Sequence, residues 1–146
     1  MSIPTSAEQT QTSGRRILIV DDEASIRLIC RINLAASGWK CEEADNGEEA
    51  IVRIRGDRPD VVLLDVMMPI RDGWMVGEDV AGDPAVRDVP IVFLSARAEQ
   101  RAHSLGAVGY LTKPLNPVGL SAAIEEILRR IRQGEREQLR AELLSG

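Results

Sequence analysis

Polar residues that could take part in catalysis or ligand binding directly follow four apolar segments of this 146-residue sequence. Each comes right after the last residue of its segment: Asp21-Asp22 after Ile17–Val20, Asp65 after Val61–Leu64, Ser95 after Ile91–Leu94, and Lys113 after Tyr110–Thr112. Short apolar runs rich in Val and Ile are typical of strands buried on both faces, as in a parallel sheet. The carboxyl ends of parallel strands meet at one edge, where ligands bind. We therefore expect the three carboxylates, the hydroxyl and the ammonium group to converge there.

The expected cluster has the composition of a phosphoryl-transfer site that uses a metal ion. Two like charges 4 Å apart repel by roughly 4 kcal/mol at an effective dielectric of 20, so clustered carboxylates need a cation. Oxygen ligands without a nearby histidine favour Mg²⁺ over Zn²⁺. Lys113 would add a positive charge and Ser95 a hydrogen-bond donor toward a phosphoryl group. One carboxylate would be the nucleophile and would form an acyl phosphate.

The sequence between these polar residues predicts alternating strands and helices. The expected strands are 17–20, 39–44, 60–64, 91–94 and 109–112, and the expected helices are 24–37, 47–55, 73–81, 97–105 and one that starts near Pro117. Asn46 is the expected N-cap of the second helix, and Gly38 and Gly56 are expected to stop the first and second. The pattern predicts an α/β doubly wound domain with helices on both faces of a five-stranded parallel sheet.

Length, composition and charge limit the domain organisation and the class of protein that the chain can have. Residues 15–132 are expected to form one domain, after a disordered lead-in (1–14) and before a helical extension or frayed tail (133–146). The net charge of −5 argues against a nucleic-acid surface. With no apolar stretch near 20 residues and no signal peptide pattern, we expect a cytoplasmic protein. Cys30 and Cys41 are expected to be small core residues, with a disulfide as the alternative.

Four motifs in order resemble the receiver domain of two-component response regulators, the CheY-like superfamily. They are ILIVDDE (Ile17–Glu23), VVLLDVMMPIRDG (Val61–Gly73), PIVFLSA (Pro90–Ala96) and GYLTKP (Gly109–Pro114). Each motif alone is weak, but their order and spacing make the combination specific. The resemblance covers about residues 15–132 and implies a flavodoxin-like fold with strand order 2-1-3-4-5.

The resemblance also implies roles for the acidic residues. Asp65 would be the phosphoacceptor. Asp22 and Asp65 would bind Mg²⁺ directly, together with the backbone carbonyl of Met67, and Asp21 would act mainly through a metal-bound water. A mere cap on the first helix is the simpler alternative for Asp21-Asp22.

Three further residues match positions that the family uses beside the phosphoacceptor. Ser95 would donate a hydrogen bond to one phosphoryl oxygen and Lys113 would pair with another. Tyr110 stands where the family often places its switch aromatic, so Ser95 and Tyr110 are the expected switch residues. An ordinary core aromatic is the alternative for Tyr110.

The implied function is that of a phosphorylated signalling module. A sensor histidine kinase or a histidine phosphotransfer protein would donate the phosphoryl group, and a downstream protein target or a second copy of the chain would respond. No direct nucleic-acid or membrane partner is expected, and the chain is not expected to be an enzyme beyond slow self-dephosphorylation. The alternatives are a pseudo-receiver that binds partners without phosphorylation, a phosphatase with an aspartyl nucleophile, and a flavin-binding protein. Met67 replaces the second aspartate of such phosphatases, and Asp21-Asp22 would repel a flavin phosphate.

The chain also departs from the family pattern on the face that receivers use for output. The stretch from Ala96 to Gly106 is shorter than usual by about one helical turn. Val108-Gly109 replaces residues that are often acidic, and Leu115 replaces a common phenylalanine. We expect the helix at 97–105 to be the least stable element of the domain.

Overall fold

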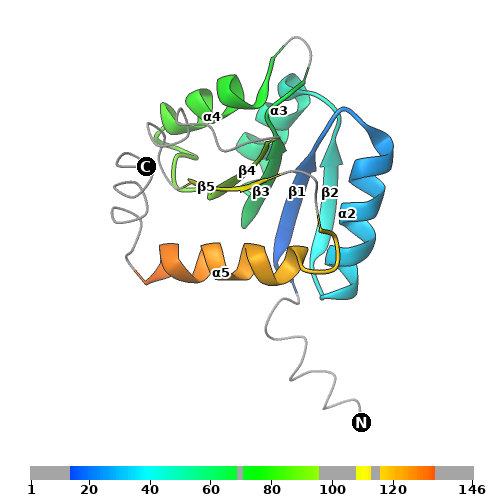
Figure 1. The fold of residues 1–146 in the computed structure, drawn as a ribbon. Coiled ribbons are helices and arrows are strands. Elements are labelled where there is room, and N and C mark those ends of the chain that lie inside the picture. Colours follow the sequence, from blue (N-terminus) through cyan, green and yellow to red (C-terminus); the bar gives the residue numbers. More distant parts are fainter. Residues whose placement is uncertain (1–13, 69–70, 96–107, 113–115, 134–146) are drawn as a thin grey trace.

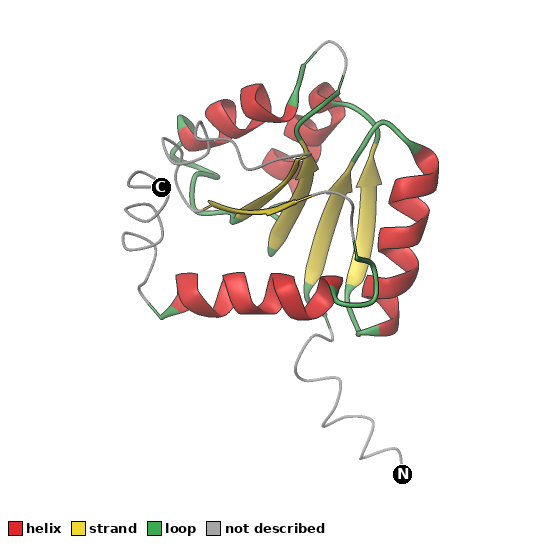
Figure 2. Cartoon of the chain, viewed as in Figure 1, coloured by secondary structure: helices red, strands yellow, loops and turns green. Residues whose placement is uncertain are grey.

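Five parallel strands form the single sheet of the computed structural model, which describes residues 14–68, 71–95, 108–112 and 116–133 (Figure 2). The strands are β1 (Arg16–Val20), β2 (Lys40–Ala44), β3 (Val61–Asp65), β4 (Ile91–Ser95) and β5 (Val108–Thr112). Their order is β2-β1-β3-β4-β5, and every neighbouring pair is parallel. The predicted fold class and strand order are therefore confirmed.

Helices cover both faces of the sheet (Figure 1). They are α2 (Ala24–Ala36), α3 (Gly47–Asp57), α4 (Gly73–Ala81) and α5 (Leu120–Arg132). Successive strand residues point to opposite faces. One core therefore contains Leu18, Val20, Val62 and Leu64 with side chains from α3 and α4. The other contains Ile17, Ile19, Val61 and Leu63 with side chains from α2 and α5.

The residues that begin and end the helices agree only in part with those expected from the sequence. The side chain of Asn46 caps α3 by accepting a hydrogen bond from Glu49 N at 2.9 Å, as predicted. Gly38 follows α2 with a φ of 99°, which a glycine adopts without strain. The prediction that Gly56 stops α3 was wrong, because the helix continues through it to Asp57. Arg58 ends the helix instead, in the left-handed conformation with a φ of 47°.

The last helix begins at Leu120 rather than near Pro117, because a turn comes first, in which Leu120 N donates to Pro117 O at 3.3 Å.

A cluster at the amino ends of the strands attaches α5 to the residues that precede β1 and β2. Trp39 Nε1 donates to Ser121 Oγ at 3.2 Å, and the Arg15 guanidinium lies 4.5 Å from the centre of the Trp39 ring. Arg15 also forms an ion pair of 3.0 Å with Glu125.

Several expectations fall outside the described part of the chain. They are the lead-in up to residue 13, the helix at 97–105, Leu115 and the tail at 134–146. Their structures remain predictions. Among the described residues, no helix combines the length and the apolar character needed to cross a bilayer.

Both cysteines are free thiols with raised pKa values. Burial is the main cause for each, and it raises the pKa of Cys30 and of Cys41 to about 11. Asp21 adds to the effect at Cys30, whereas Arg31 opposes it at Cys41. Cys30 belongs to the core and Cys41 packs against it, as predicted.

We expect both thiols to react slowly with alkylating reagents in the folded protein. The thiolate is the reactive species, so a pKa near 11 leaves about a hundredfold less of it at pH 8 than in a thiol of ordinary pKa. Iodoacetamide labelling followed by mass spectrometry should proceed quickly only in denaturant. Rapid labelling of the native protein would contradict the described burial.

Candidate functional site

Three carboxylates meet where β1 and β3 end. The two strands are in register, with Val20 opposite Leu64, so the residues that end them come together. One oxygen each of Asp21, Asp22 and Asp65 lies within 4.8 Å of the others. Asp21 and Asp65 are buried and Asp22 is exposed, which leaves one side of the cluster open to solvent. The predicted convergence of these three residues is confirmed.

Asp21 is held by hydrogen bonds on its backbone and side chain. Its N–H donates to Ala44 O at 3.2 Å, which extends the pairing of β1 with β2. The Arg27 guanidinium donates to Asp21 O at 2.7 Å and also pairs with Glu43 at 2.9 Å. Asp21 Oδ1 accepts from Glu23 N at 2.9 Å. Since α2 has Glu23 as its N-cap and no side-chain capping bond, Asp21 braces the turn before α2 rather than capping it.

Asp65 is the last residue of β3, and the described residues on either side of the loop that follows it are joined by close backbone contacts. Val66 N donates to Leu94 O at 3.1 Å, and Met67 N donates to Asp65 Oδ1 at 3.3 Å. Gly73 N, further along the chain, donates a hydrogen bond to Val66 O at 3.0 Å. A Cβ on Gly73 would lie 2.8 Å from Val66 Cα and would also overlap the carbonyl oxygen of Asp65. Only glycine fits this close approach.

The donor set suits a hard divalent cation. All three groups are carboxylates, and oxygen-rich sites of this kind bind Mg²⁺ or Ca²⁺ rather than softer metals. At the 4.8 Å limit, each pair of negative charges repels by roughly 3.5 kcal/mol at an effective dielectric of 20. A bound cation would offset that repulsion.

The expected hydroxyl and ammonium groups are only partly placed. Ser95 ends β4, and its backbone lies in register with that of Thr112 on β5. β5 ends at Thr112, at the same edge of the sheet as the carboxylates, and Lys113 is the next residue in the sequence. Tyr110 lies opposite Phe93 in the same pair of strands. The side chains of Ser95 and Tyr110, and Lys113 itself, lie outside the described part of the chain, so their roles remain predictions.

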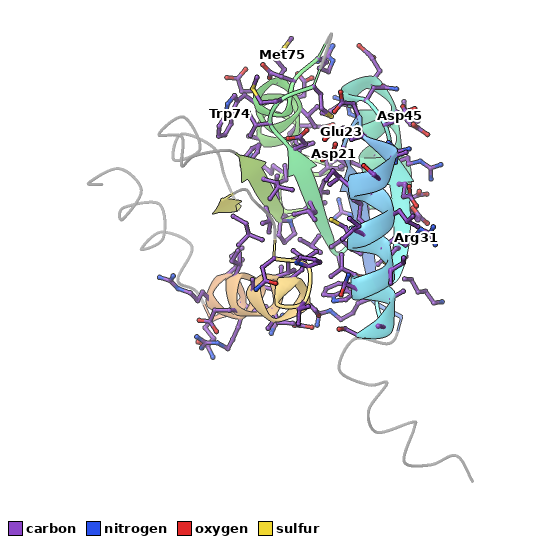
Figure 3. All side chains as sticks on the ribbon, turned by 45° about the vertical axis from the view of Figure 1, so that its right-hand side comes forward. Asp21, Glu23, Arg31, Asp45, Trp74 and Met75 are labelled. Carbon is purple, nitrogen blue, oxygen red and sulfur yellow. The ribbon has the colours of Figure 1, made fainter. Side chains whose placement is uncertain are left out.

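Figure 3 draws the described side chains on the whole ribbon. The side chains of Asp21 and Glu23 lie toward the same end as Trp74 and Met75 at the start of α4, whereas Arg31 lies further along α2. Sequence reasoning did not identify Arg27, which fixes the backbone of Asp21 from one turn into α2. The sequence around Arg27 gives no signal of this contact, since arginines are common on exposed helix surfaces.

Comparisons with known proteins agree with this geometry. The family described as response regulator receiver domain matches residues 17–125. The phosphate regulon transcriptional regulatory protein PhoB of Pseudomonas aeruginosa is 38% identical over 128 residues, which are 85% of this chain and 56% of that protein. The probable transcriptional regulator ycf27 of Porphyra purpurea is 42% identical over 124 residues, 82% of this chain and 50% of that protein. The chain thus spans about half the length of these curated relatives.

Solved structures show the same fold. The chemotaxis response regulator CheY4 of Vibrio cholerae superposes with a TM-score of 0.73 at 31% identity, covering 77% of this chain and 98% of that one. A response regulator from Chloroflexus aurantiacus gives the same TM-score and identity, with 80% of this chain and 98% of that one covered. Sequence match, strand order and acidic cluster agree, and this chain belongs to the response regulator receiver domain family.

Proposed function

We propose that this receiver domain accepts a phosphoryl group on Asp65 from a phosphohistidine of a sensor histidine kinase or a histidine phosphotransfer protein. The observation that carries the proposal is the position of the Asp65 carboxylate, which is buried at the end of β3 with two further carboxylates within 4.8 Å. A buried carboxylate with two others beside it is costly unless a cation is bound, and an acidic cluster with an open side therefore suits a metal-assisted acceptor.

The chemical step forms one bond and breaks one. A carboxylate oxygen of Asp65 attacks the phosphorus atom and forms the O–P bond of an acyl phosphate. The P–N bond to the imidazole of the donor breaks, and the imidazole keeps the electron pair. The hydrogen bond from Met67 N to Asp65 Oδ1 holds the carboxylate in a defined orientation.

Asp22, Asp65 and the backbone carbonyl of Met67 would hold Mg²⁺, with Asp21 in support. When bound, the ion supplies positive charge that offsets the charge of the transferring group. Asp22 is the exposed member of the cluster and therefore faces the side from which a donor arrives. The Arg27 guanidinium donates to the backbone carbonyl of Asp21 and so helps to hold this member of the cluster in place.

Phosphorylation would change which partners the domain binds. The phosphoryl group adds about −1.5 to −2 charges and new acceptor oxygens at this edge of the sheet. Ser95 and Lys113 are the proposed partners of those oxygens, and Tyr110 is the proposed switch residue that moves with them. The group then favours one of two states of the ends of β4 and β5, which a downstream protein target or a second copy of the chain distinguishes.

The test is incubation with acetyl phosphate followed by intact-mass analysis. We expect one added phosphoryl group in the presence of Mg²⁺ and almost none in excess EDTA, because the clustered carboxylates repel an anionic donor when no cation is bound. Absence of any mass increase with Mg²⁺ would favour the alternative, a pseudo-receiver that binds partners without phosphorylation.

A further inference from the structure

Arg71, in the loop between β3 and α4, is the centre of a second group of charges. Arg71 Nε lies 3.2 Å from Glu48 Oε2 on α3, and Arg71 Nη1 forms an ion pair with Asp79 Oδ2 on α4. One side chain therefore connects the loop that follows Asp65 to both helices on this face of the sheet. The Arg71 side chain is itself mostly buried, with 29% of its surface exposed.

The backbone of Arg71 is held at the same place. A Cβ on Gly47, the first residue of α3, would lie only 2.6 Å from the carbonyl oxygen of Arg71. The loop thus packs directly on the start of α3. The next residue, Asp72, accepts a hydrogen bond from Met75 N at 3.0 Å and so begins α4. Arg71 therefore contacts α3 with both its side chain and its backbone.

We propose that Arg71 is a positioning residue that holds this loop in the arrangement that binds the divalent cation. The inference rests on the proposed function, in which Asp65 and the carbonyl of Met67 are ligands. Gly73 N, two residues after Arg71, donates to Val66 O at 3.0 Å, and Met67 N donates to Asp65 Oδ1 at 3.3 Å, so a shift of the backbone at Arg71 would displace Asp65 and Met67 together. A site that is correctly arranged only part of the time binds its ligand more weakly, in proportion to that fraction.

Simple electrostatics predicts the opposite effect, which makes the proposal testable. Removal of a positive charge near the cluster should by itself strengthen cation binding, because one repulsion is lost. Loss of positioning should weaken binding. The ion pairs are partly exposed, at 69% for the Glu48 side chain and 40% for that of Asp79, so each is weak alone. We expect a net loss of about two- to tenfold in Mg²⁺ affinity.

The experiment is a calorimetric titration of the full chain with Mg²⁺ for wild type, Arg71→Met and Arg55→Met. Methionine keeps the length of the apolar stem and removes the guanidinium. Arg55 is the matched control, because it pairs with Asp83 at 2.9 Å and also links α3 to the segment after α4, away from the loop. Arg71→Met should bind two- to tenfold more weakly than wild type, and Arg55→Met should match wild type.

Two further readouts separate positioning from a merely structural role. Arg71→Lys keeps the charge but not the planar fork, so its affinity should fall between those of wild type and Arg71→Met. If Arg71→Met does not fold, the Mg²⁺ affinity of Arg71→Lys alone tests the positioning role of Arg71. Urea unfolding should show a small loss of stability in both variants, somewhat larger in Arg71→Met, which loses two ion pairs, than in Arg55→Met, which loses one. Only the former should lose affinity.

The possible results distinguish this inference from the proposed function. Equal or tighter Mg²⁺ binding in Arg71→Met, with wild type binding normally, would overturn the role of Arg71 and leave the acceptor role of Asp65 intact. If wild type itself binds no Mg²⁺, the proposed function fails first and the inference with it.

Discussion

Asp65→Asn is expected to abolish the uptake of a phosphoryl group from acetyl phosphate. Asparagine has nearly the same shape, so the loop and its hydrogen bond from Met67 N should persist. The amide is not a useful nucleophile, however, and cannot form the acyl phosphate. We expect a loss of at least about a thousandfold in rate, well beyond the effect of any change in metal affinity. Intact-mass analysis over time measures it directly.

Asp22→Asn is the control that separates acceptor from metal ligand. It leaves Asp65 in place but removes one charge from the cluster, so Mg²⁺ affinity should fall. Uptake should therefore slow at low Mg²⁺ and recover at high Mg²⁺, whereas Asp65→Asn should not recover at any concentration. A phosphoryl group on Asp65→Asn would mean that another residue is the acceptor.

The sheet and the acidic cluster could be predicted because their signals are local. Four short apolar segments, each followed by a polar residue, predict four of the five strands and the edge at which their polar ends meet. Strand order needed the family resemblance, since apolar runs alone do not say which strands are neighbours. Asp21 and Asp65 were placed together by one rule, that parallel strands end at the same edge.

The residues that brace the cluster could not be predicted from local pattern. Arg27 donates to Asp21 O and pairs with Glu43 on a neighbouring strand, and Arg71 reaches α3 and α4 from the loop. Such contacts join elements that come together only in the fold. Gly56 misled for a different reason: the helix continues through it for one further residue, and Arg58 N closes the last turn by donating to Ile54 O at 3.0 Å.

Gly73→Ala is expected to destabilise the domain by about 2–3 kcal/mol, the usual cost of overpacking a tight site. The added Cβ would lie 2.8 Å from Val66 Cα and against the carbonyl oxygen of Asp65. These are backbone atoms next to the end of β3, so relief requires the loop to shift rather than a side chain to turn. Urea unfolding followed by tryptophan fluorescence measures the change.

Gly56→Ala should change stability in the opposite direction and is the matched control. Gly56 lies inside α3, and a Cβ there meets nothing within 4 Å. Alanine should therefore stabilise the helix by about 0.5–1 kcal/mol, through lower entropy of the unfolded chain and better helix propensity. Equal stability of wild type and Gly73→Ala would show that the loop yields easily. Such a loop would be too flexible to orient Asp65. If the loop is rigid, folded Gly73→Ala should take up the phosphoryl group more slowly than wild type at saturating Mg²⁺.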